Sequence, residues 1–287
     1  MTVIDIERLH EDFGAQVNGI NFAEALSQQQ VDSVLEAIDE FSFLLFPKQD
    51  LDDGIQLELT RRLGEPEPNH ARLGRDGVID YFGTVGNVRE DGTSVGNAHE
   101  HTKHMTGNNM WHTDSSFRKV PSFVSINYAY EVPEEGGETQ YTSARSAYSR
   151  LSNETKRIID PLLVVHDYVY SRSKVAKVKE SHAKSLPPVQ QKLVRTNKNN
   201  GKKNYYAGAH AREVVGWDRM RGRQLLDELT ETATVSEHTY THCWKPRDLV
   251  IWDNRCLLHR GLGYDADKYR RRMRQTRVAG VGPTADE

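Results

Sequence analysis

The second half of the chain is a series of short apolar segments separated by turn residues, and this pattern restricts the possible folds more than any other feature. The segments 123–131, 237–243, 248–252 and 272–279 are rich in β-branched and aromatic residues or alternate between apolar and polar positions. Short strands at such spacing favour a sandwich or barrel in which sheets share one core. We therefore expect a mainly β fold.

Helical periodicity is confined to segments that we expect to lie outside the sheets. One helix is predicted after Ser27, a capping residue, because apolar residues then recur at i, i+3, i+4 and i+7. Further helices are expected after Asp52, over 144–160 and over 219–232. The predicted fold class is therefore mainly β with flanking helices.

Two long segments interrupt these patterns. Gly, Asn, Asp, His and Arg dominate residues 65–109, whereas residues 171–203 are basic and contain Pro187-Pro188. A long segment without its own periodicity is usually a functional loop or a disordered one. We expect 65–109 to form loops over the mouth of an active site, and 171–203 to be a surface insertion that can act as a lid.

The composition argues against both a membrane and a nucleic acid as a partner. The formal net charge is −3, and no apolar run approaches the roughly 18 residues of a transmembrane helix. The N-terminus has no basic segment followed by an apolar one, so we expect no secretory signal. Two cysteines, Cys243 and Cys256, suit a reducing compartment, so we expect a cytoplasmic location.

The stretch Trp111-His112-Thr113-Asp114 offers two metal ligands two positions apart. In a strand, side chains i and i+2 lie on the same face, so the imidazole and the carboxylate would project into one space. His259 follows an apolar strand and can supply a third ligand. Two histidines and one carboxylate form the facial triad of non-haem iron(II) oxygenases. A His-x-Asp pair alone is weak evidence, since most such pairs are surface residues, but its context strengthens it.

The stretches 111–117, 136–139, 252–255 and 259–261 resemble the taurine dioxygenase/2,4-dichlorophenoxyacetate dioxygenase family, and the similarity extends over most of the chain. The resemblance implies a double-stranded β-helix, or jelly roll, in a single domain over residues 1–287. It also implies iron(II), 2-oxoglutarate and O2 as cofactors. The expected reaction couples conversion of 2-oxoglutarate to succinate and CO2 with oxidation, in the first instance hydroxylation, of a substrate C–H bond. Desaturation, cyclisation and fragmentation stay open.

The resemblance further assigns residues to 2-oxoglutarate. Its far carboxylate needs a cation and a hydroxyl donor, and a guanidinium offers a planar fork for that purpose. Family spacing after His259 assigns the cation to Arg270, and spacing after His112 assigns the hydroxyl to Thr139. Trp252 is expected to form a wall of the same pocket.

Substrate contacts are assigned in the same way to Arg274 and Asn108. In an extended strand, residues 270, 272, 274 and 276 share one face, so Arg274 would enter the same cavity as Arg270. In similar enzymes this position contacts the acidic group of the substrate. The resemblance therefore implies a small substrate that bears a carboxylate or sulfonate. Taken alone, the basic run would instead be a solvated strand or a nucleic-acid patch.

Three alternatives remain open at this stage. The same ligands could serve a zinc hydrolase, which would not depend on 2-oxoglutarate, or a metal-binding jelly roll without activity, which would form no succinate. The basic run could belong to a nucleic-acid demethylase, whose DNA binding would be sensitive to salt. A homo-oligomer is possible, since members of the resembled family are often dimers or tetramers.

Overall fold

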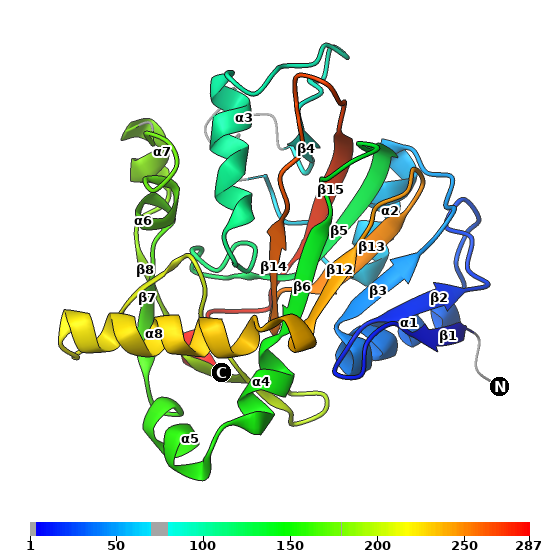
Figure 1. The fold of residues 1–287 in the computed structure, drawn as a ribbon. Helices are drawn as coiled ribbons and strands as arrows, with labels where there is room; N and C mark the ends of the chain where they lie inside the picture. Colours follow the sequence, from blue (N-terminus) through cyan, green and yellow to red (C-terminus); the bar gives the residue numbers. More distant parts are fainter. Residues whose placement is uncertain (1–3, 70–79, 179) are drawn as a thin grey trace.

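Two sheets whose strands pair mainly in antiparallel fashion form the centre of the protein (Figure 1). The computed structural model describes residues 4–69, 80–178 and 180–287. The large sheet has the strand order β1-β2-β3-β13-β5-β15-β4. These strands are β1 (Asp5–Arg8), β2 (Ala15–Asn18), β3 (Phe43–Phe46), β13 (Leu249–Asp253), β5 (Ser122–Glu131), β15 (Arg272–Ala279) and β4 (Gly83–Gly86).

A smaller sheet packs against the large one through an apolar core. It has β6 (Thr139–Ser143) between β12 (Thr239–His242) and β14 (Leu257–Gly261). The shared core includes Phe43, Tyr141, Trp252, Leu257 and Met273, which come from strands of both sheets. Two sheets that share a core and carry helices outside are the arrangement of a jelly roll, the fold that the family resemblance implied.

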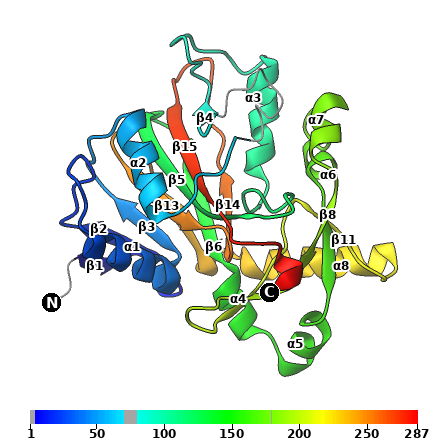
Figure 2. The ribbon, with the colours of Figure 1, turned by 180° about the vertical axis from the view of Figure 1, so that it is seen from behind.

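The other face of the large sheet is covered by α1 (Gln28–Phe41) and α2 (Asp53–Leu63), which lie in front of it in Figure 2. Strand β3 shows how the two cores are separated. Leu44 and Phe46 join the core against the helices, whereas Phe43 and Leu45 join the core between the sheets. Side chains alternate across a strand, so β3 is buried on both faces and is apolar throughout.

The caps of both helices agree with the sequence expectations. The Ser27 side chain accepts a hydrogen bond from the Gln30 backbone, and the Gln30 side chain accepts one from the Ser27 backbone in return. Asp52 caps α2 by accepting from the Ile55 backbone. Each cap satisfies an amide at the helix start and fixes where the helix begins.

Most of the other strands and helices of the second half of the chain pack around a third apolar cluster, away from α1 and on the side where α8 lies in both views (Figures 1 and 2). The strands are β7 (Leu163–His166), β8 (Val189–Lys192) and β11 (Ala211–Val214) in one sheet, and β9 (Val194–Thr196) and β10 (Lys203–Tyr205) in another. The helices are α4 (Ala144–Arg150), α5 (Asn153–Ile159), α6 (Tyr168–Arg172), α7 (Glu180–Ser185) and α8 (Arg219–Ala233). Tyr168 and Leu186 belong to a separate small cluster with Phe117.

The basic segment 171–203 is integrated into this cluster more deeply than a surface insertion would be. It contributes β8 and β9, and Leu193 between them is fully buried. Its lysines had suggested exposure, but pairing of β8 with β7 draws the backbone into the fold. Of the described residues in this segment, none lines the cavity that holds the expected metal ligands.

The segment 65–109 has structure of its own. It adds the edge strand β4, the short helix α3 (Glu100–Met105) and the 3-10 turn η2 (Thr106–Asn109). Residues 70–79 of this segment lie outside the described residues. Within the described part of the chain, no helix is both long and apolar enough to cross a membrane.

Candidate metal and cosubstrate site

One cavity brings together six of the eight residues that the sequence assigned to function. His112, Asp114 and His259 line it, and so do Thr139, Trp252 and Asn108. Both sheets contribute to its walls, and the α3–η2 segment contributes Thr102, Met105, Thr106 and Asn109. Arg270 and Arg274 are not among its lining residues.

Backbone hydrogen bonds hold the two histidines side by side. The His112 amide donates to the His259 carbonyl at 3.0 Å, and the His259 amide donates to the His112 carbonyl at 2.8 Å. His259 lies within β14, opposite Tyr141 of β6. The expected strand over 112–114 is only partly formed, because pairing ends at His112 and a turn begins at Asp114. The side chains of His112 and Asp114 still lie on one side, with Nε2 and Oδ1 3.8 Å apart.

The three side chains present a compact set of donor atoms. Nε2 of His112 and Nε2 of His259 each lie 3.8 Å from Oδ1 of Asp114. All three candidate ligand atoms lie within 4.8 Å of one another, and both histidines are more than nine-tenths buried. Atoms this close can reach one metal ion, and two imidazoles with one carboxylate suit a divalent transition metal.

Electrostatics keeps these groups in their ligand forms near neutral pH. Burial, assisted by the nearby His112, lowers the pKa of His259 to about 3. Burial also lowers the pKa of His112, although Asp114 opposes the change. Burial alone would raise the pKa of Asp114, but His259, His112 and Arg277 together lower it to about 2. Neutral imidazole and ionised carboxylate are the forms that bind metal.

Neighbouring side chains fix the orientation of the Asp114 carboxylate. Ser125 donates to Oδ2 at 2.7 Å, and Gln275 donates to the same oxygen at 2.9 Å. Asn254 in turn donates to the Ser125 hydroxyl at 2.9 Å. Since both donors use Oδ2, Oδ1 is left facing the histidines. Such supporting hydrogen bonds orient metal ligands and tune their affinity. Sequence reasoning did not identify Ser125 or Gln275.

The arginine in the cavity is Arg271, and the structure contradicts the placement of Arg270 there. The Arg270 side chain is 47% exposed and pairs with Glu131 at 2.6 Å. The neighbouring Arg271 is only 7% exposed and lines the cavity with Thr139. Burial lowers the pKa of Arg271, and its buried Nε has no hydrogen-bond partner among the described residues.

Alternation along β15 explains this difference. Arg271 lines the cavity, Met273 packs between the sheets, and Gln275 reaches Asp114. Side chains alternate between the two faces of a strand, so these three residues share one face. The pairing with β5 is irregular at this point, but the extra residue is Tyr130 of β5, so the alternation of β15 is unbroken. The odd-numbered residues therefore face the cavity, not the even-numbered ones expected from spacing.

Arg274 is displaced from the cavity for the same reason. Its guanidinium pairs with Asp53 of α2 at 2.6 Å and donates to Thr84 at 2.9 Å, on the helix-covered side of the large sheet. The expected substrate contact by Arg274 is therefore contradicted. The residue four positions beyond the cavity arginine is the neutral Gln275.

The other assigned side chains are oriented by contacts that the sequence did not reveal. The Thr139 hydroxyl oxygen accepts a hydrogen bond from Trp244 at 2.9 Å. The hydroxyl can still donate its own proton to another acceptor. The Asn108 side-chain oxygen accepts from Arg172 at 2.7 Å. Trp244 and Arg172 carry no local sequence signal, because only the tertiary fold places them beside these residues.

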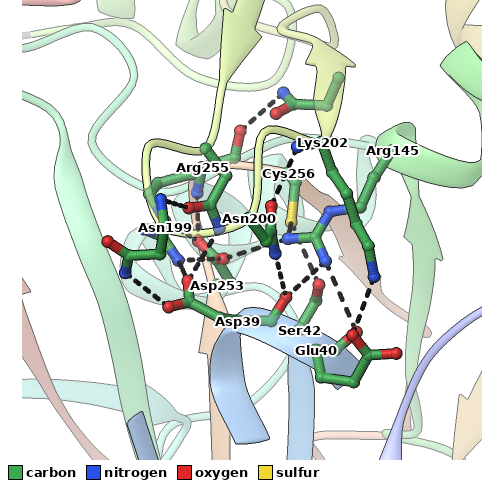
Figure 3. Close-up of polar contacts among 12 residues, drawn as sticks. Asp39, Glu40, Ser42, Arg145, Asn199, Asn200, Lys202, Asp253, Arg255 and Cys256 are labelled. Carbon is green, nitrogen blue, oxygen red and sulfur yellow. Dashed lines mark hydrogen bonds and ion pairs between the residues drawn. The ribbon is translucent and has the colours of Figure 1, made fainter. Parts of the chain in front are cut away.

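The stretch 252–255, whose residues carried part of the family resemblance, also has a structural role (Figure 3). Arg255 donates to Asp253 within the β13–β14 turn and to Asp39 at the end of α1, the latter at 2.6 Å. Asn197 and Asn199 donate to the same Asp39 carboxylate. The turn that leads into β14, and hence to His259, is thereby tied to two distant segments.

Figure 3 also shows that Cys256 belongs to this network as a structural residue. Its sulfur accepts from Arg145 at 3.3 Å and lies 3.3 Å from the Ser42 hydroxyl. Burial raises the pKa of Cys256 to about 11, so the thiol stays protonated at neutral pH. A protonated buried thiol is a poor nucleophile, which agrees with the absence of a predicted role for it.

Comparisons with known proteins agree with this geometry. The model of the family described as "Taurine catabolism dioxygenase TauD, TfdA family" matches residues 5–277. The chain is 35% identical over 285 residues to an alpha-ketoglutarate-dependent 2,4-dichlorophenoxyacetate dioxygenase of Burkholderia sp. strain RASC, covering 96% of this chain and 95% of the relative. It is 30% identical to an (S)-phenoxypropionate/alpha-ketoglutarate-dioxygenase of Sphingobium herbicidovorans, covering 96% and 95%.

A solved structure is similar over nearly the whole length. The crystal structure of AAD-2 in complex with Mn(II) and N-oxalylglycine matches with a TM-score of 0.89 and 34% sequence identity, covering 98% of each chain. A structure described as a putative alpha-ketoglutarate-dependent 2,4-D dioxygenase from Burkholderia xenovorans matches with a TM-score of 0.82 and 29% identity, covering 96% of this chain and 97% of that one.

Proposed function

The chain belongs to the taurine catabolism dioxygenase TauD, TfdA family, and we propose how its own residues serve that chemistry. It is a 2-oxoglutarate-dependent dioxygenase, so the enzyme class predicted from the sequence is confirmed. A divalent metal, 2-oxoglutarate and O2 are confirmed as the cofactor set. Neither a hydrolase nor a metal-binding protein without activity is favoured.

His112, Asp114 and His259 hold the metal, and the metal is iron(II). The observation that carries this assignment is the buried group of two neutral imidazoles and one ionised carboxylate within 4.8 Å. When bound, the iron supplies the oxygen activation that couples decarboxylation of 2-oxoglutarate to oxidation of a C–H bond. Ser125 and Gln275 keep Oδ1 of Asp114 directed at the ion by binding Oδ2.

Arg271 and Thr139 receive the far carboxylate of 2-oxoglutarate. A buried guanidinium with an unpartnered Nε needs an anion, and the Thr139 hydroxyl can donate a second hydrogen bond beside it. Trp252 forms the adjacent apolar wall; its ring centroid lies 4.9 Å from that of His259. Arg271 thus takes the role that sequence spacing gave to Arg270.

The substrate is a small molecule, and an aryloxyalkanoate is the first class to test. Two relatives named for phenoxy acids are similar over more than nine-tenths of this chain. The α3–η2 segment lines the cavity with Asn108 and Met105, so it is the wall that holds the substrate C–H bond beside the metal and keeps water out. A carboxylate or sulfonate on the substrate remains the expectation from the sequence.

We propose three further properties that the sequence leads us to expect. The residues 1–287 form one domain in which 65–109 covers the mouth of the site, and the protein is cytoplasmic. Both cysteines are free, which agrees with a reducing compartment. A homo-oligomer is possible, and sedimentation of the purified protein measures that state directly. The net charge of −3 gives no support to a nucleic-acid partner.

Anaerobic titration with iron(II) and then 2-oxoglutarate tests the proposal, with the weak visible charge-transfer band of the metal–2-oxoglutarate complex as the readout. We expect the band in the wild type, its loss in His112→Ala, and a clearly weaker 2-oxoglutarate affinity in Arg271→Ala.

Arg270→Ala is the matched control, since it removes the neighbouring arginine that points to Glu131, and its affinity should equal that of the wild type. Loss of affinity in Arg270→Ala with retention in Arg271→Ala would reject the assignment. Iron binding without any band in the wild type would reject the cosubstrate site altogether.

A further inference from the structure

Arg172 of α6 is a partly buried cation beside the cavity, and the proposed chemistry does not yet use it. In both views α3 and α6 lie near each other at one end of the molecule (Figures 1 and 2). The Arg172 guanidinium donates to the His104 carbonyl at 3.2 Å and to the Asn108 side-chain oxygen at 2.7 Å. It packs so tightly against Gly107 that a Cβ there would collide with it. Arg172 therefore holds the η2 turn that forms part of the cavity wall.

The charge of Arg172 has no paired carboxylate in the described part of the chain. Its hydrogen bonds are to neutral oxygens, its ring neighbour is Tyr168 at 5.7 Å, and its buried Nε is without a partner. Burial lowers its pKa, and Asp114 is the acidic group that acts on it electrostatically. A buried charge is costly unless an opposite charge compensates it. Such a position favours a bound anion nearby.

Asn108 connects this charge to the cavity. An arginine side chain can only donate hydrogen bonds, so the Asn108 oxygen must face Arg172. The amide nitrogen then lies on the opposite edge of the side chain, and Asn108 lines the cavity. The guanidinium also polarises the amide it binds, which strengthens the N–H groups as donors. Asn108 is thereby oriented to donate to an acceptor in the cavity.

Three other side chains that could bind an acidic substrate group are already occupied. Arg274 is paired with Asp53 on the far side of the sheet. Gln275 uses its nitrogen on Asp114, and its oxygen accepts from Arg277 at 3.0 Å. Arg271 is taken by 2-oxoglutarate in the proposed function. A divalent metal, the Asp114 carboxylate, the 2-oxoglutarate dianion and Arg271 are together neutral, so the charge of Arg172 stays without a counterion.

We propose that Arg172 is a positioning residue for substrate selection: it orients and polarises Asn108 as the donor to the acidic group of the substrate, and its charge selects an anionic substrate. The inference rests on the proposed function, since it takes Arg271 to be occupied by 2-oxoglutarate. The resemblance had assigned a direct contact between Arg274 and the acidic group of the substrate. In this proposal Arg172 acts on that group indirectly, through the side-chain amide of Asn108.

A binding experiment without turnover tests this selection. The protein is loaded with Mn(II) and N-oxalylglycine, and calorimetry measures the dissociation constants of phenoxyacetate and of its neutral analogue phenoxyacetamide. We expect the wild type to prefer the acid. Arg172→Gln should weaken binding of the acid by roughly 10- to 100-fold, because a hydrogen bond that involves a charged group is lost, and should change amide binding little. Arg172→Lys should restore part of the preference, since it restores the charge.

The matched control is Lys174→Gln, which removes an exposed cation two residues further along and should leave both constants unchanged. Equal losses for acid and amide in Arg172→Gln would show a purely structural role and overturn the inference. So would unchanged acid binding, or a wild type that binds none of phenoxyacetate, an alkylsulfonate and an alkyl sulfate. Failure of N-oxalylglycine to bind at all would instead overturn the proposed function, and this inference with it.

Discussion

At the scale of single residues, the proposed metal site depends on which oxygen of Asp114 is free. Ser125 and Gln275 both donate to Oδ2, so the carboxylate can offer Oδ1 to an ion without rotating. Both side chains bind Asp114, and neither is hydrogen-bonded to His112 or His259. Their contribution is therefore to orientation, and it should be visible as metal affinity before any turnover is measured.

Ser125→Ala is expected to weaken metal binding by about 10- to 100-fold, the usual effect of losing a hydrogen bond to a metal ligand. Titration with Mn(II) or iron(II) under anaerobic conditions measures it. Ser122→Ala is the matched control, because Ser122 shares the partner Asn254 but approaches only the main-chain oxygen of Asp114, at 3.5 Å. Equal losses in the two variants would assign the effect to Asn254 and the local packing.

At the scale of elements, the turn between β13 and β14 controls where His259 lies. Asp253 in this turn is fully buried, and Arg255 pairs with it at 2.8 Å while also binding Asp39 of α1. Removing one partner of a buried ion pair leaves a charge without compensation, which costs far more than losing an exposed pair. The residues of this turn that resemble the family therefore contribute to stability as well as to the placement of His259.

Arg255→Met should lower the free energy of unfolding by about 3 kcal/mol, at the low end for a broken buried pair because Arg145 stays 3.8 Å from Asp253. Urea unfolding of the metal-free protein measures this. Lys202→Met removes an exposed pair with Glu40 in the same network and should cost no more than about 1 kcal/mol. A similar cost for both variants would contradict the burial argument.

At the scale of the whole molecule, binding of the metal joins segments that are distant in the sequence. The proposed ligands come from the bridge at His112, the turn at Asp114 and strand β14 of the small sheet, while Arg271 precedes β15 of the large sheet. A metal and cosubstrate bound between the sheets should therefore stabilise the folded state against unfolding, because they bind the native arrangement alone.

Saturation with Mn(II) and N-oxalylglycine at about 100 times their dissociation constants should add about 2.7 kcal/mol for each ligand, seen as a rise in Tm of several degrees. Scanning calorimetry measures the rise. N-oxalylglycine should add stability only when Mn(II) is present, since the metal holds one of its ends. Asp114→Ala should abolish both increments. Stabilisation by N-oxalylglycine alone would indicate binding elsewhere.

Local pattern determined much of this protein from the sequence alone. Alternation and turn residues predicted the strands 123–131 and 272–279, and caps predicted the starts of α1 and α2, because such signals act over a few residues. The ligand types, the short spacing and the apolar strand before His259 likewise selected His112, Asp114 and His259, and the resemblance added Thr139, Trp252 and Asn108. The structure brings all six to one cavity.

Only the tertiary structure decided which arginines face that cavity and which neighbours support its ligands. The odd-numbered face of β15 packs between the sheets, so Arg271 enters the cavity, whereas Arg270 and Arg274 do not. Arg172 reaches Asn108 from a segment that looked like a surface insertion. Alternation defines the two faces of a strand but not which face packs inward, and contacts between distant segments leave no periodic trace, so neither could be read from spacing along the chain.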